Sequence, residues 1–138
     1  MPAKDIFHNA VRSALEKDGW VITHDPLYIQ VGGTEMYVDL GAERLIAAEK
    51  GSQKIAVEIK SFITHSDLAE FHLALGQFLN YRLALKKRLP DWILYLAIPV
   101  DVYDTFFPRP FIQDAVSEYQ LKLVVFAPEQ EEIILWKS

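Results

Sequence analysis

Residues 37–60, YVDLGAERLIAAEKGSQKIAVEIK, decide the fold of this chain, because two strand-like segments meet there. The first segment runs from Tyr37 to Glu49 and the second from Lys54 to Phe62. The residues between them, Lys50 to Gln53, include Gly51 and are typical of a hairpin loop. The sequence therefore predicts two neighbouring antiparallel strands.

Three side chains on this predicted hairpin indicate one kind of chemistry. Because side chains alternate along a strand, Glu58 and Lys60 lie on the same face. Asp39 belongs to the other strand and folds back toward them. A hairpin that turns at Gly51-Ser52 leaves Asp39 a few residues beyond Lys60, so their approach requires a bulge or bend near Gly41.

Two carboxylates and a lysine are the residue set of a metal-dependent phosphodiesterase. Carboxylate oxygens suit Mg²⁺ or Mn²⁺, and a neighbouring lysine stabilises charge on a phosphate or orients the attacking water. We therefore expect Asp39 and Glu58 to bind a metal ion and Lys60 to assist. The alternative is an exposed strand with a surface ion pair between Glu58 and Lys60, which contributes only about 0–1 kcal/mol to stability.

Two helices are predicted, one before and one after the hairpin. The first spans Lys4–Lys17 and ends at Asp18-Gly19. Its apolar positions are Ile6, Phe7, Ala10, Val11, Ala14 and Leu15. The second is capped by Thr64 or Ser66 and runs to about Lys87. Its core stripe consists of Leu68, Phe71, Leu75, Phe78 and Leu79. A second, partly polar stripe, which can face the hairpin, consists of Glu70, Ala74, Gln77 and Tyr81.

The rest of the chain is predicted to contain strands and one short helix. The segment Trp92–Ile98 is almost continuously apolar, as expected for the centre of a sheet. Turns are predicted at His24-Asp25-Pro26 and Gly32-Gly33. The other expected elements are strands at Trp20–Thr23, from near Glu35, at Leu121–Phe126 and at Ile133–Trp136, and a helix between Pro110 and Tyr119.

Composition limits the class of protein. A chain of 138 residues with 51% apolar content is long enough for one globular domain, which we expect to span 1–138. Without cysteine it has no disulfide and no thiolate metal site. No apolar run is long enough to cross a membrane and no signal peptide is recognisable, so we expect a soluble cytoplasmic protein.

The histidines and the basic residues give weaker signals. His65 and His72 make a poor zinc site, because no cysteine and no third ligand lies nearby. His8 either approaches the hairpin site or is a solvent-facing or packed histidine, and the second reading is favoured. His24 is most simply a turn residue. The one basic cluster, Lys86-Lys87-Arg88, either touches DNA or complements the dipole at the end of its helix, and the dipole reading is favoured.

The chain resembles the PD-(D/E)xK nuclease superfamily at the residues described above. The order helix, three strands, helix, strand is the core of the restriction-endonuclease-like fold. Asp39 matches the first carboxylate of the motif, Glu58 the second and Lys60 its lysine. Gln77 and Tyr81 match the Q-x-x-x-Y element of RecB-like members. The resemblance implies an αβββαβ core, with a central mixed sheet flanked by helices.

Over most of its length the chain is also similar to the XisH family, cyanobacterial factors that control excision of the fdxN DNA element during heterocyst differentiation. The family resemblance implies a role in DNA rearrangement or its regulation, commonly with a companion XisI-type protein. One departure from the superfamily motif is Val38, which stands where many members have proline. The stretches that carry the family resemblance are DGW at 18–20, THDP at 23–26, DLGAE at 39–43, AAEKG at 47–51, VEIKSF at 57–62 and GQFLNY at 76–81.

Two functions follow from these resemblances. In a Mg²⁺-dependent DNA nuclease, the Ile59 carbonyl would add to the metal ligands, Gln77 would hydrogen-bond a phosphate or a metal ligand, and Tyr81 would do likewise or pack beneath. In a non-catalytic regulatory module, the chain would act through a XisI-type partner or a recombinase. The net charge of −5 favours the module, whereas the intact carboxylate and lysine set favours the nuclease. The apolar content also suggests a homodimer.

Overall fold

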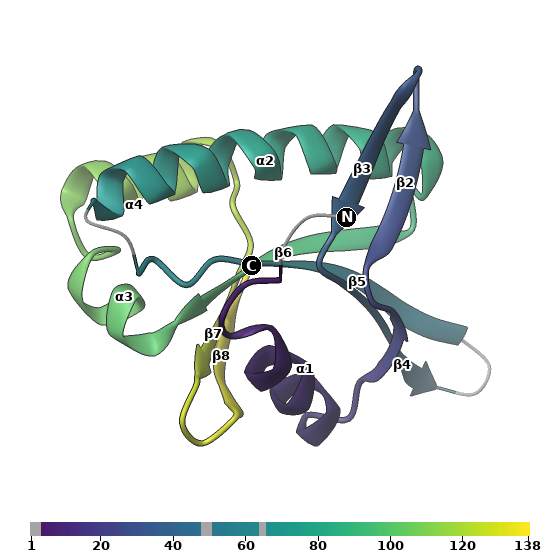
Figure 1. Cartoon of the computed structure of the whole chain (residues 1–138), viewed down its shortest axis with the longest axis horizontal. Helices are drawn as coiled ribbons and strands as arrows, with labels where there is room; N and C mark the ends of the chain where they lie inside the picture. Colours follow the sequence, from purple (N-terminus) through teal and green to yellow (C-terminus); the bar gives the residue numbers. More distant parts are fainter. Residues whose placement is uncertain (1–3, 48–50, 64–65) are drawn as a thin grey trace.

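The computed structural model of the chain describes residues 4–47, 51–63 and 66–138. Two long helices lie on opposite faces of a twisted sheet, and a two-stranded ribbon projects beside one of them (Figure 1). In chain order the elements are α1 (His8–Lys17), β1 (Val21–His24), β2 (Leu27–Val31), β3 (Thr34–Val38), β4 (Leu40–Ala47), β5 (Gly51–Ile59), α2 (Asp67–Arg88), β6 (Trp92–Pro99), α3 (Val100–Thr105), α4 (Pro110–Glu118), β7 (Leu123–Ala127) and β8 (Glu132–Lys137).

The main sheet is mixed, with strand order β1-β4-β5-β6-β7-β8. Strands β5, β6 and β7 run parallel to one another, and the remaining neighbours are antiparallel. Strands β2 and β3 form a separate ribbon between β1 and β4 in the sequence. Without this ribbon, the order up to β6 is helix, three strands, helix, strand, as predicted. The expectation of a mixed α/β fold with a central sheet and flanking helices is confirmed.

Alternation along β5 and β6 divides the buried residues into two cores. Ala56 and Leu96 belong to the core beneath α2, together with Phe71. Val57 and Tyr95 point to the other face and belong to the core beneath α1. Glu58 shares the face of β5 with Ala56 and therefore points to the side of the sheet that α2 covers. A functional site built on Glu58 lies on that side.

The pairing of β4 with β5 differs from the predicted hairpin. Leu40 pairs with Val57 and Leu45 with Ser52, so Gly51 to Gln53 belong to β5 and the prediction that they form the loop is wrong. Pairing these residues satisfies their backbone hydrogen-bonding groups, and this outweighs their turn propensity. The β4/β5 register is regular near Gly41 and shifts only between Leu45 and Ala47. The irregularity predicted near Gly41 lies instead in the β1/β4 ladder, whose register shifts between Ile22 and His24, opposite Ala42 and Gly41.

The helix ends show which local signals dominate. Helix α1 begins at His8 rather than Lys4, and Ile6 is 68% exposed instead of buried. The reason is that Asp5 lies outside the helix, where its carboxylate accepts a hydrogen bond from the Phe7 N–H at 2.9 Å. Helix α2 begins as predicted, because the Ser66 Oγ accepts from the Ala69 N–H at 3.1 Å.

Two elements were not predicted, and two expected core positions are more exposed than expected. Strand β2 follows the predicted turn directly, and α3 follows the central strand β6. Leu68 was placed in the α2 core stripe but is 43% exposed, and Leu79 is only partly buried. The other strand and helix ends agree with prediction to within about three residues, as expected for element boundaries. In the described part of the chain, no helix is long and apolar enough to span a bilayer.

The core beneath α2 gives a stability prediction. Phe71 is 2% exposed and its ring lies 5.8 Å from that of Phe106 and 5.9 Å from that of Phe107. Phe71→Ala should lower the free energy of unfolding by about 3–5 kcal/mol, because it leaves a cavity among packed rings. Urea titration provides the measurement. Leu73→Ala on the same helix, at a position 53% exposed, should change the free energy of unfolding by less than about 0.5 kcal/mol. Equal losses of unfolding free energy in the two variants would contradict the packing described for Phe71.

Candidate functional site

Asp39 and Glu58 interlock through backbone hydrogen bonds. Asp39 is the single residue between β3 and β4, where the chain passes from the ribbon into the main sheet. Its N–H donates to Glu58 Oε1 at 3.3 Å, and its own Oδ2 accepts from the Ile59 N–H at 2.8 Å. The β4/β5 register therefore brings together the two carboxylates that the sequence singled out.

Burial sets the electrostatics of this pair. Glu58 is 6% exposed, and burial followed by the neighbouring Asp39 charge raises its pKa to about 9. Burial also raises the pKa of Asp39, against the lowering effect of the hydrogen bond from Ile59. Two carboxyl groups in this situation share one proton near neutral pH, unless a cation takes its place.

Lys60 and Ile59 follow Glu58 at the end of β5. The Lys60 side chain is half-buried, and its positive charge lowers the pKa of Glu58, so the ammonium acts on the carboxylate pair. Among the described residues it forms no ion pair with either carboxylate. Ile59 contacts Asp39 through its N–H; the role expected for its carbonyl stays a prediction.

Helix α2 brings Tyr81 to the same region, as its predicted polar stripe requires. The pKa of Tyr81 is raised to about 12 by burial and then by the charges of Glu58 and Asp39, so the phenol lies within their electrostatic reach. Gln77 lies one turn earlier, and its Oε1 is buried without a hydrogen-bond partner in the described structure. An unpartnered buried amide oxygen one helical turn from Tyr81 is suited to accept a hydrogen bond from a ligand or a water molecule.

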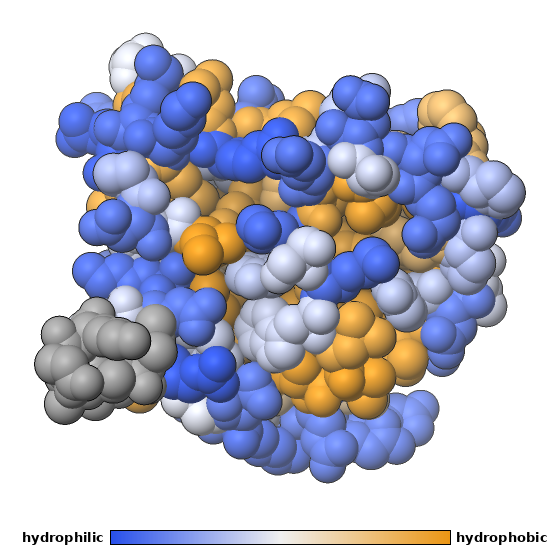
Figure 2. Space-filling model, turned by 180° about the vertical axis from the view of Figure 1, so that it is seen from behind, coloured by the Kyte–Doolittle hydropathy of each residue, from blue (hydrophilic) through white to orange (hydrophobic). Residues whose placement is uncertain are grey.

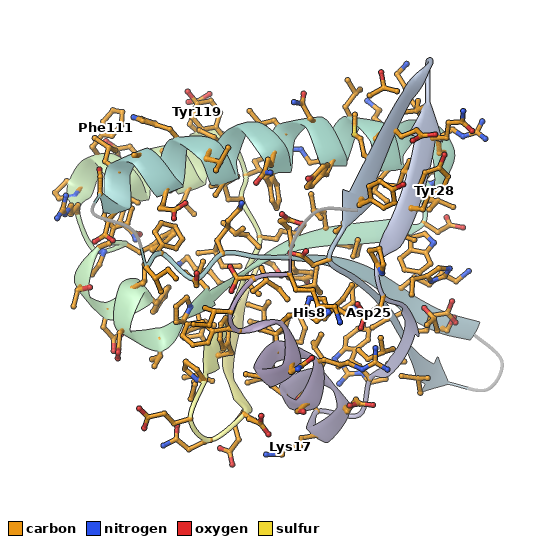
Figure 3. All side chains as sticks on the ribbon, viewed as in Figure 1. His8, Lys17, Asp25, Tyr28, Phe111 and Tyr119 are labelled. Carbon is orange, nitrogen blue, oxygen red and sulfur yellow. The ribbon has the colours of Figure 1, made fainter. Side chains whose placement is uncertain are left out.

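A buried network on the α1 side was missed by the sequence analysis. His8 is 3% exposed, and its Nε2 lies 2.7 Å from Asp25 Oδ1 (Figure 3). The Arg12 Nη1 donates to Asp25 Oδ2 at 2.6 Å. Burial acts to raise the pKa of Asp25, but Arg12 and His8 outweigh it and the pKa is lowered. His8 is buried, so the favoured reading of a packed histidine is confirmed, and from this position its charge also lowers the pKa of Asp39.

Asp5 is a further residue whose role was not predicted from the sequence. Its Oδ2 accepts from the Ser61 N–H at 3.1 Å, which ties the start of the chain to the end of β5. Its charge contributes to the raised pKa of Asp39. An aspartate three residues before His8, ahead of the helix, is a capping signal, and the helix predicted from Lys4 concealed it.

The other candidate residues lie apart from this site. His24 ends β1 and its ring lies 5.5 Å from the Trp92 ring, so it is a strand residue rather than a turn residue. His72 is exposed on α2. His65 and Glu49 lie outside the described residues, so the expectations that involve them are not addressed.

The residues present fit a hard divalent cation in part. Asp39 and Glu58 supply only oxygen, and their mutual repulsion is relieved by positive charge between them. In the described residues, no group of three or more histidine, aspartate or glutamate side chains is placed to hold an ion. Two carboxylates with water completing the shell suit Mg²⁺, which keeps several waters in protein sites.

Comparison with known proteins identifies relatives of the whole chain. The family model described as XisH protein matches residues 1–134. A crystal structure of an XisH family protein from Nostoc punctiforme PCC 73102 is 49% identical, with a TM-score of 0.89 over 97% of this chain and 100% of that one. A second, of an fdxN element excision controlling factor protein from Anabaena variabilis, is 50% identical, with a TM-score of 0.89 over 98% and 100%. No curated protein matches the chain.

The raised pKa of Glu58 gives a pH prediction. A carboxyl with a higher pKa in the folded chain adds stability in full below its usual value of 4.5, and loses it as pH rises toward 9. Glu58→Gln keeps an oxygen for the Asp39 N–H but cannot ionise. It should be more stable than the parent at pH 8, by on the order of 3 kcal/mol, with the difference shrinking toward pH 5.

Urea unfolding of both proteins at pH 5, 6.5 and 8 measures this difference. Glu16→Gln, at an exposed position on α1, is the matched control and should show no pH-dependent difference from the parent. A constant difference between Glu58→Gln and the parent across this pH range would show that Glu58 is already ionised in the folded protein.

Proposed function

This chain belongs to the XisH family, and on that premise we propose that it acts in DNA rearrangement as a Mg²⁺-dependent nuclease of PD-(D/E)xK type. The observation that carries this proposal is the pair of half-buried Asp39 and buried Glu58, held by reciprocal backbone hydrogen bonds. The name of the Anabaena variabilis relative refers to control of fdxN element excision, and we extend that role to this chain as part of the proposal.

The arrangement of elements supports a restriction-endonuclease-like fold. The main sheet and its helices follow one another as α1, β1, β4, β5, α2 and β6. The first motif carboxylate stands at the start of β4, and the second stands at the end of β5 with the lysine just beyond it. Helix α2 carries the glutamine and tyrosine of the remaining motif on the side that faces the carboxylates.

The chemistry expected of the site begins with its charge. Mg²⁺ bound by Asp39 and Glu58 would supply Lewis acidity and lower the pKa of a bound water. Without a metal ion, Glu58 holds a proton at neutral pH. It must release this proton before its carboxylate can bind a metal ion. Lys60, half-buried and close enough to influence Glu58, would stabilise negative charge that develops on a phosphate.

Residues from both helices would assist these groups. Tyr81 keeps its proton to about pH 12 and would donate a hydrogen bond to a phosphate oxygen. The unpartnered Gln77 Oε1 would accept a hydrogen bond from the attacking water or from a neighbouring water molecule. His8 is hydrogen-bonded to Asp25 and lowers the pKa of Asp39, which opposes the effect of burial and would favour the ionised form of that carboxylate that binds metal.

A second candidate function is a non-catalytic regulatory module that acts through a XisI-type partner or a recombinase. Two observations favour it. The net charge of −5 gives no long-range attraction to DNA, and the described residues contain no cluster of three acidic or histidine ligands. In that case the buried pair would be a structural joint between the ribbon and the sheet, and homodimerisation would be one route to a larger assembly.

A nicking assay tests the catalytic proposal. With Mg²⁺ or Mn²⁺, the protein should convert supercoiled plasmid DNA to the nicked form. Glu58→Gln and Lys60→Ala should each slow nicking by at least about 100-fold, because the first removes a charged metal ligand and the second removes the cation that stabilises the reacting phosphate. Lys54→Ala, on the same face of β5 but at its other end, is the charge-matched control and should nick as the parent does. Equal nicking by all three variants would assign the activity to a contaminant.

Calorimetric titration with Mn²⁺ distinguishes the two functions without DNA. The parent should bind Mn²⁺ at pH 7 and release close to one proton, seen as a dependence of the heat on the ionisation enthalpy of the buffer, because Glu58 must ionise first. Asp39→Asn should abolish binding. A parent protein that binds no Mn²⁺ and nicks no DNA, with or without a XisI-type companion, would favour the regulatory module.

A further inference from the structure

A cavity of about 770 Å³ lies at the opposite end of the sheet from the carboxylate pair. It is bounded by α2, by the end of α4 and by the first residues of β6. Trp92 in its wall pairs with Lys54, whereas Glu58 pairs with Leu96, four residues further along. The cavity is therefore about 13 Å from the candidate site along the strands, and is a separate feature. On the face turned away in Figure 1, apolar residues reach the surface between hydrophilic ones (Figure 2).

The charge of the cavity wall is opposite to that of the chain. Arg82, Lys122 and Lys137 line it together with Ser138, and no aspartate or glutamate side chain does. The whole chain has 19 acidic and 14 basic residues, so a wall with three cations and no acidic side chain is a local reversal. Among the described residues, none of the three forms an ion pair. Three neighbouring cations repel one another, and an anion in the cavity would relieve this repulsion.

Arg82 is held in place by neutral groups. Its Nη1 donates to the carbonyls of Tyr119 at 2.8 Å and Gln120 at 3.2 Å, at the end of α4. Its guanidinium lies over the Phe78 ring, 5.5 Å from the centroid. The guanidinium is thus oriented by the protein while its charge is uncompensated. This arrangement is suited to bidentate binding of a phosphate or carboxylate.

The rest of the wall gives the ligand an apolar surface and a size. Ser117 and Gln120 add polar groups beside the cations. A volume of about 770 Å³ lies within the range of sites for small organic ligands, which is roughly 300–1,000 Å³. The apolar lining consists of Phe78, Trp92, Ile93, Leu94, Val116 and Leu121. A ligand that satisfies the whole wall has a multiply charged anionic group and an apolar or aromatic body.

We propose that this cavity binds a multiply charged organic anion, with its anionic group between Arg82, Lys122 and Lys137 and its body against the apolar wall. A phosphate ester of nucleotide size has both parts. Such a ligand would join α2, α4 and the end of β8, which come from distant parts of the sequence, and so would stabilise the folded chain.

Calorimetry with defined probes tests this proposal, in a buffer freed of metal ions by a chelating resin so that metal-bridged binding elsewhere is excluded. AMP supplies a phosphate ester, citrate a polycarboxylate and adenosine a neutral body. AMP should bind saturably and adenosine should not. Binding by AMP alone supports a phosphate-ester site, and binding by citrate alone or by both supports a general polyanion site. Binding of neither anion, or of adenosine as tightly as AMP, would overturn the proposal.

Charge-matched variants locate the binding. The double variant Lys122→Ala/Lys137→Ala should weaken binding of the anion by at least about tenfold, because it removes two charge-assisted contacts. Lys86→Ala/Arg88→Ala removes the same charge from exposed positions at the end of α2 and should bind as the parent does. Equal affinity of the first variant and the parent would refute the assignment.

A measurement on the parent protein covers the case in which the first variant does not fold. In a heteronuclear NMR titration with the same anion, amide shift changes should concentrate in residues 113–122 and at the start of β6. Changes confined to the surroundings of Asp39 and Glu58 would exclude the cavity. These anion titrations contain no metal and no DNA. Their outcome therefore does not depend on whether the nuclease proposal is right.

Discussion

The reciprocal hydrogen bonds between Asp39 and the end of β5 are the constraint on which the functional part of the structure depends. Each carboxylate accepts a backbone N–H from the segment that carries the other. These bonds fix the point where the ribbon of β2 and β3 joins the main sheet, and they hold two acidic groups in a poorly solvated position. The pair is consequently both a structural joint and a site of unrelieved negative charge.

The two helices complete that site from opposite faces of the sheet. Helix α2 brings Tyr81 within reach of both carboxylates, and α1 brings His8, which is fixed by Asp25. Asp5 ties the chain ahead of α1 to Ser61. The chain ahead of α1, the helix α1, the end of β5 and the helix α2 therefore all contribute residues to the site around Asp39 and Glu58. Their charges act in opposition, since His8 favours and Asp5 opposes the ionised form of Asp39.

The sheet also separates two regions of opposite charge. The carboxylate pair lies at the end of β5, whereas the cation-lined cavity lies at the start of β6. Parallel pairing of these two strands fixes the distance between the regions, because a β-strand does not compress along its length. A protein with a net negative charge can thus carry one site suited to cations and another suited to anions, each with its own local field.

The sequence by itself determined the main elements and their faces. Periodicity placed α2, a nearly continuous apolar run placed the central strand β6, alternation placed Glu58 and Lys60 together, and the cap at Ser66 set the start of α2. Only the tertiary structure decided the register that sets Asp39 beside Glu58, the start of α1 after Asp5, and the network around His8. Periodicity repeats every two residues in a strand, so it fixes a face but leaves the register open. That choice is made by pairing and burial across residues distant in the chain.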